Sequence, residues 1–67
     1  MTPIEAARKR LGMTQSELAE KAGCTQGHIS QLEKGLTNPS RELAKRLATA
    51  LELTVMEILY PEDAEKK

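Results

Sequence analysis

The sequence predicts an all-α fold, a compact bundle of five short helices. Two observations carry this prediction: helix-start signals recur along the 67 residues in the same chemical form, and glycines follow several of the apolar stretches. Apolar residues recur at helical spacing within those stretches, and no segment alternates apolar and polar residues as a half-buried strand would. We expect the helices near residues 3–11, 15–22, 26–34, 41–51 and 55–60.

Each predicted helix begins at a residue whose side chain can cap it. Thr25 is expected to cap the helix at 26–34, and either Asn38 or Ser40 caps the helix at 41–51. The other three helices open on a capping box, in which a threonine hydroxyl and a glutamate three residues later satisfy otherwise unpaired backbone N–H groups. The threonines of these boxes are Thr2, Thr14 and Thr54.

Glycines mark three helix ends, since glycine readily adopts the left-handed conformation that closes a helix. They are Gly12, Gly23 and Gly35. Pro61 is expected to end the last helix. Residues 1–61 are therefore predicted to form a single domain, and residues 62–67 a charged C-terminal tail that frays.

The composition excludes several classes of protein. A chain of 67 residues, with 39% hydrophobic and 30% charged residues, is an ordinary globular domain in which an enzyme's deep pocket is not expected. No stretch approaches the roughly 20 apolar residues of a membrane span and no signal segment opens the chain, so a cytoplasmic protein is expected. The only aromatic residue is Tyr60, which excludes the stacking platforms of single-strand and RNA binders.

The side chains capable of chemistry form no catalytic or metal site in the sequence. The one cysteine, Cys24, cannot form an internal disulfide, and no cluster of cysteine and histidine offers metal ligands. His28 has no cysteine, aspartate or glutamate arranged to partner it, and no serine has a base and an orienting group at helical spacing. We therefore expect no enzyme activity, no metal and no cofactor.

The helices predicted at 15–22 and 26–34 are joined by only three residues, which is a helix-turn-helix pattern. Ala19 is expected where the two helices touch, because a larger side chain there would hold them apart. Cys24 is expected to fill the space after the turn as a small apolar side chain, with a redox-sensing thiol as the alternative. The other contact residues are predicted to be Leu18, Ala22, Ile29 and Leu32.

These residues together resemble the lambda-repressor/Cro-like (Xre-type) helix-turn-helix DNA-binding domains. The resemblance covers roughly residues 4–60 and implies a sequence-specific regulator of transcription that binds double-stranded DNA with its third helix in the major groove. It implies no cofactor, no catalysis, no membrane and no small-molecule ligand. The matching segments are residues 11–23, 25–26, 29–35, 38–40 and 47–51.

The resemblance also implies which residues contact DNA. Gln15 is expected to bind a phosphate at a helix N-terminus, where free N–H groups already favour an anion. Asn38, in the loop after the third helix, is expected to be a second backbone contact, and Ser30 a contact to a base edge or a phosphate. Glutamine can pair bidentately with adenine. The groove-facing positions of the third helix are Thr25, Gln26, Gly27, His28 and Gln31.

Two residues depart from the family's pattern. Gly27 stands where relatives often carry a base-reading side chain, so it either reads nothing or lets the backbone approach a thymine methyl closely. Glu52 stands at the bend before the last helix, where relatives usually have glycine. This implies either a strained left-handed glutamate or a differently shaped turn.

Charge is unevenly distributed along a chain whose formal net charge is zero. Residues 1–46 carry eight basic and five acidic side chains, whereas residues 47–67 carry two and five. The positive part holds the helix-turn-helix, which favours attraction to DNA, with a shallow salt dependence because few cations would meet phosphates. The run of Arg8, Lys9 and Arg10 either faces solvent or places one side chain on a phosphate, and Glu33 is expected to pair structurally with a basic side chain.

The last helix carries more apolar residues than two turns can bury beneath themselves. Part of this set is expected to meet a second copy of the chain in a two-fold dimer, which would place the third helices about 34 Å apart on a pseudo-palindromic operator. Alternatively these side chains close a small core, or the domain is a protein-interaction module like an antitoxin or co-activator. The expected interface residues are Leu53, Val55, Met56, Leu59 and Tyr60.

Overall fold

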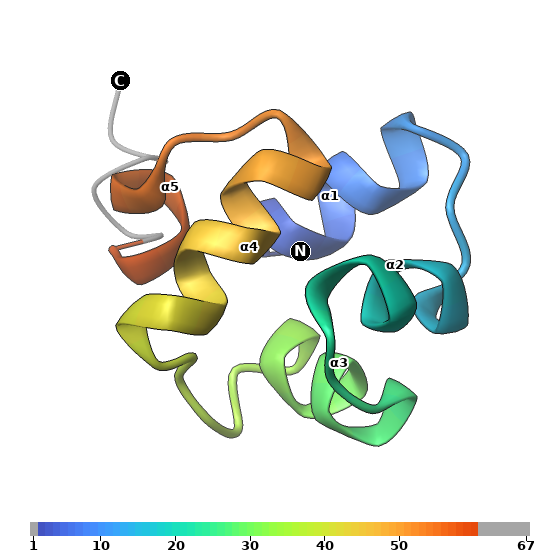
Figure 1. Cartoon of the computed structure of the whole chain (residues 1–67), viewed down its shortest axis with the longest axis horizontal. Helices are drawn as coiled ribbons and strands as arrows, with labels where there is room; N and C mark the ends of the chain where they lie inside the picture. Colours follow the sequence, from blue (N-terminus) through green and yellow to red (C-terminus); the bar gives the residue numbers. More distant parts are fainter. Residues whose placement is uncertain (1, 61–67) are drawn as a thin grey trace.

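The computed structural model describes residues 2–60 and confirms the all-α prediction (Figure 1). No strand occurs within these residues. The predicted Pro61 stop and the tail at 62–67 lie outside the described residues. The five helices are α1 (Pro3–Arg10), α2 (Gln15–Ala22), α3 (Gln26–Glu33), α4 (Arg41–Leu51) and α5 (Val55–Leu59).

Every helix begins at a hydroxyl cap. Each capping oxygen accepts a hydrogen bond from the backbone N–H three residues later, and Ser40, not Asn38, caps α4. The capping boxes at Thr14 and Thr54 are complete. At Thr2 only the threonine half forms, because the Glu5 carboxylate pairs instead with Lys9 at 3.1 Å. This neighbour lowers the pKa of Glu5.

The predicted glycines adopt the left-handed conformation, and one glutamate does so as well. Gly23 ends α2 with φ 74°, while Gly12 and Gly35 follow the ends of α1 and α3. Glu52 ends α4 with φ 59° and ψ 39°, which decides between the two alternatives for this bend in favour of a left-handed residue. A side chain in this conformation carries a steric cost of roughly 1–2 kcal/mol.

Replacing Glu52 by glycine is therefore expected to raise the free energy of unfolding by about 1 kcal/mol, because glycine adopts a left-handed conformation without steric cost. In a domain of this size the melting temperature should rise by roughly 4–8 °C. The matched control is Glu20→Gly, an exposed position inside α2, where glycine should lower stability by about 1 kcal/mol. Equal effects of the two substitutions would contradict the assignment of strain to Glu52.

The core forms around α4, which packs against α1, α2 and α5, while α3 packs mainly on α2 (Figure 1). The helix predicted at 3–11 ends one residue earlier, at Arg10. Leu11 is its C-cap and is 37% exposed, so the residue at the end of the predicted helix does not belong to the core. The buried apolar residues are Ile4, Ala7, Leu18, Ala19, Ala22, Ile29, Leu32, Leu43, Ala44, Leu47, Ala48, Leu51 and Ile58.

Candidate nucleic-acid interface

Helices α2 and α3 form the predicted helix-turn-helix. Gly23 and Cys24 turn the chain, and the Cys24 N–H donates to the Ala19 carbonyl at 2.9 Å. Ala19 is 4% exposed, so the helices meet closely where a small residue was predicted. Cys24 packs partly buried against the core, and this burial raises the pKa of its thiol. A raised pKa is the opposite of what a reactive redox thiol needs.

A chain of side-chain hydrogen bonds joins the N-terminal ends of α2 and α3. The Gln26 amide nitrogen Nε2 lies 3.5 Å from Gln15 Oε1, and Ser16 Oγ donates to Gln26 Oε1 at 3.2 Å. Gln15 in turn donates from Nε2 to Glu33 Oε1 at 3.0 Å. The structure therefore brings together the two glutamines that the sequence assigned separately to a phosphate and to a base. Ser16 was not predicted, although its place directly after Gln15 at the start of the helix could have suggested it.

Glu33 anchors this chain of hydrogen bonds in the interior. Its side chain is 4% exposed and pairs with Arg8, from Nε at 2.6 Å and from Nη2 at 3.2 Å. Arg8 also donates from Nη1 to the Met13 carbonyl at 2.8 Å. The hydrogen bond to Glu33 raises the pKa of Arg8. This confirms the structural role expected for Glu33.

Arg8 is consequently unsuited to a phosphate contact, since each of its three nitrogens already donates to Glu33 or Met13 and its side chain is only 11% exposed. Of the basic run in α1, Lys9 forms an exposed pair with Glu5, and Arg10 is exposed. A phosphate contact from this helix is therefore left to these two residues.

Four of the remaining candidate positions form one polar face of α3, and the other three lie beside it. The helix buries Ile29, Leu32 and Glu33 on the side toward the other helices. Thr25 caps it by accepting from the His28 N–H at 3.1 Å, and His28 is partly buried. Asn38 is exposed in the loop between α3 and α4. The residues of the opposite face are Gln26, Gly27, Ser30 and Gln31, of which only Ser30 is partly buried.

Gly27 is helical and a Cβ built on it would meet nothing within 4 Å. Gly27→Ala is therefore expected to raise the free energy of unfolding by about 1 kcal/mol, the difference in helix propensity. Chemical denaturation would measure it, and Gly23→Ala is the matched control. Gly23 has φ 74°, so alanine there should destabilise the fold. A loss of stability in Gly27→Ala would mean that this glycine has a structural purpose.

The residues predicted for a dimer interface divide into two groups. Leu53, Val55 and Leu59 pack partly buried against the core, so the last helix does help to close it. Met56 and Tyr60 remain 61% and 52% exposed. The dimer stays a prediction, with these two side chains as its exposed centre.

The described residues contain no group of three or more histidine, cysteine, aspartate or glutamate side chains placed to hold a metal ion. Among the same residues, no helix is both long enough and apolar enough to cross a bilayer.

Comparisons with known proteins agree with this geometry. Residues 4–58 match a family model described as helix-turn-helix. An uncharacterized HTH-type transcriptional regulator of Methanothermobacter thermautotrophicus is 54% identical over 50 residues, which are 75% of this chain and 72% of that protein. The HTH-type transcriptional regulator SinR of Bacillus licheniformis is 38% identical over 61 residues, which are 90% of this chain. The chain spans 55% of that SinR's length.

A solved structure is similar as well. It is the N-terminal DNA binding domain of SinR from Bacillus subtilis, with a TM-score of 0.76 and 37% sequence identity, covering 84% of this chain and 83% of that one. The helix-turn-helix family that these comparisons identify consists of regulators of transcription and is not a family of enzymes. The chain thus belongs to the lambda-repressor-like helix-turn-helix family.

Proposed function

We propose that this chain is a sequence-specific transcriptional regulator of the Cro/repressor type, which binds double-stranded DNA with α3 in the major groove. The observation that carries the proposal is the contact between Gln15 and Gln26 at the N-terminal ends of α2 and α3. At that point one glutamine can bind a phosphate while the other reads a base edge. The similar proteins are described as transcriptional regulators and as a DNA binding domain, which supports the same function.

The shape of α3 supports base reading. Residues four apart lie next to each other on a helix, so Gln26 adjoins Ser30, and Gly27 adjoins Gln31. These four positions form a continuous polar stripe opposite the buried side of the helix. Because Gly27 has no side chain, the backbone of α3 at this position can come close to a base pair. Two side chains with bidentate hydrogen-bonding capacity, Gln26 and Gln31, remain to specify sequence.

We further propose that the regulator acts as a homodimer on a pseudo-palindromic operator. Met56 and Tyr60 offer an exposed apolar centre for a two-fold contact. A two-fold axis would place the two copies of α3 about one DNA turn apart, roughly 34 Å.

Selection of binding sites from random duplexes with purified protein tests the proposal. We expect enrichment of a pseudo-palindrome with half-sites about one turn apart, bound with an affinity that falls modestly as salt rises. Enrichment of single half-sites would contradict the dimer but not DNA reading. Absence of any enriched sequence would contradict sequence-specific binding.

A protein-interaction module on the same fold is the second candidate, favoured by the exposed side chains of Leu36, Met56 and Tyr60. Such a module would tolerate substitution of Gln26 and Gln31 but lose its activity on substitution of Met56 and Tyr60.

A further inference from the structure

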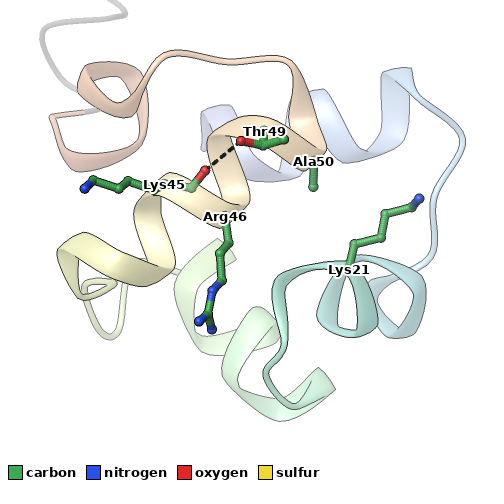
Figure 2. A pocket seen from close by; sticks show the side chains of 5 residues that line it. All are labelled: Lys21, Lys45, Arg46, Thr49 and Ala50. Carbon is green, nitrogen blue, oxygen red and sulfur yellow. Dashed lines mark hydrogen bonds between the residues drawn. The ribbon is translucent and has the colours of Figure 1, made fainter.

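A groove of about 560 Å³ lies between α2 and α4 (Figure 2). Lys21 lines it from α2, and the other lining residues come from α4. Thr49 and Ala50 contribute small side chains to it. The Thr49 hydroxyl already donates to the Lys45 carbonyl at 3.1 Å, so Thr49 and Ala50 offer an incoming group little hydrogen bonding.

The groove is strongly cationic. No acidic residue of the described chain lines it, whereas Lys21, Lys45 and Arg46 do, and all three are exposed. Lys21 and Lys45 form no ion pair with any residue between 2 and 60. Arg46 meets only the exposed Glu42 carboxylate, at 3.7 Å, a pair that stabilises little in water. The positive charge of this surface is therefore available to a partner.

This surface adjoins the turn of the helix-turn-helix, where Arg46 Nη1 lies 3.4 Å from the position that a Cβ on Gly23 would occupy, but it differs from the candidate DNA interface. Lys21 stands six residues after Gln15, about 9 Å along α2 at 1.5 Å per residue. None of the residues predicted to contact DNA lines the groove. The cationic groups of Lys21, Lys45 and Arg46 point away from one another in Figure 2. They cannot enclose a single small anion, and instead offer charge at several separate points.

We propose that this groove docks an acidic segment of a second protein. Carboxylates along such a segment would meet the separated cations, and its small side chains would lie over Thr49 and Ala50. The positive charge of the groove favours an acidic partner, because opposite charges speed the encounter of two proteins and orient them. A protein segment fits better than a further stretch of DNA, because its small side chains can pack over Thr49 and Ala50 between the cations, whereas a DNA backbone would meet the cations alone.

The test uses the whole chain and a labelled helical peptide of alternating glutamate-rich and alanine-rich turns. We expect saturable binding, with NMR amide shifts confined to the neighbourhood of Lys21 and residues 45–50. Substituting Lys21→Gln and Lys45→Gln together should raise the Kd at least about tenfold, in the range that close charge pairs contribute at interfaces. The same peptide with glutamine for glutamate should not bind.

The matched control for the pair Lys21→Gln and Lys45→Gln is the pair Lys34→Gln and Arg41→Gln, two exposed positions that do not line the groove. It should change the Kd by less than about twofold, because exposed charges at a distance are screened. Equal weakening in the two variants would overturn the proposal, as would absence of saturable binding. Loss of duplex affinity in the groove variant alone would also overturn it, by assigning the groove to DNA. Thermal unfolding of both variants verifies that they fold.

Discussion

Replacing Gln26 and Gln31 together by alanine is expected to weaken binding to the selected duplex by at least about 30-fold. Each bidentate contact to a base is worth about 1–3 kcal/mol, so losing two costs about 2–6 kcal/mol. Both side chains are exposed, so the free energy of unfolding should change by less than about 0.5 kcal/mol for each substitution. Fluorescence anisotropy with the selected duplex and with a scrambled one measures the two affinities.

The comparison between the duplexes is decisive. Affinity for the scrambled duplex should hardly change, because phosphate contacts supply most non-specific binding. Thr49→Ala is the control, since Thr49 is exposed on α4 and borders a groove that none of the residues proposed to contact DNA lines. Unchanged discrimination between the duplexes in the double variant would refute base reading by these glutamines and favour the interaction module.

The existence of the helices follows from signals only three residues apart, which is why the sequence predicts them well. A threonine or serine hydroxyl meets a backbone N–H three positions later at every cap, and this geometry is local. The C-terminal ends of the helices were predicted less accurately, because no comparable side-chain hydrogen bond marks them. Whether Leu11 or Tyr60 still belongs to a helix is decided within the last turn, where helix assignments commonly differ by a residue.

The candidate site was predicted as a set of positions but not as a connected arrangement. Arg8 and Glu33 are 25 residues apart in sequence, so no spacing rule could pair them. Their pairing depends on how α1 packs beside α3, a long-range contact that burial decides. The same limit applies to the basic groove, whose Lys21 and Arg46 come together only because α2 packs against α4.

Arg8→Met is expected to destabilise the domain by about 2–4 kcal/mol. The substitution leaves the Glu33 carboxylate, 4% exposed, without its cationic partner, and breaking one half of a buried pair costs far more than the pair contributes. A 67-residue domain has a total stability of only about 3–10 kcal/mol, so the variant should be studied in a Glu52→Gly background that restores some of the loss. Urea denaturation followed by circular dichroism measures the free energy of unfolding.

The double variant Arg8→Met and Glu33→Leu separates the charge from the packing. Replacing both partners by apolar side chains of similar size removes the unpaired charge, so the double variant should be more stable than either single variant. The free energy of unfolding of the double variant should still lie about 1–2 kcal/mol below that of the parent, because the Met13 carbonyl and the Gln15 amide lose their partners. Strictly additive losses would contradict the coupling. Since Glu33 also holds Gln15, the folded double variant should bind the selected duplex more weakly than the parent, which would connect the buried pair to the DNA-reading face.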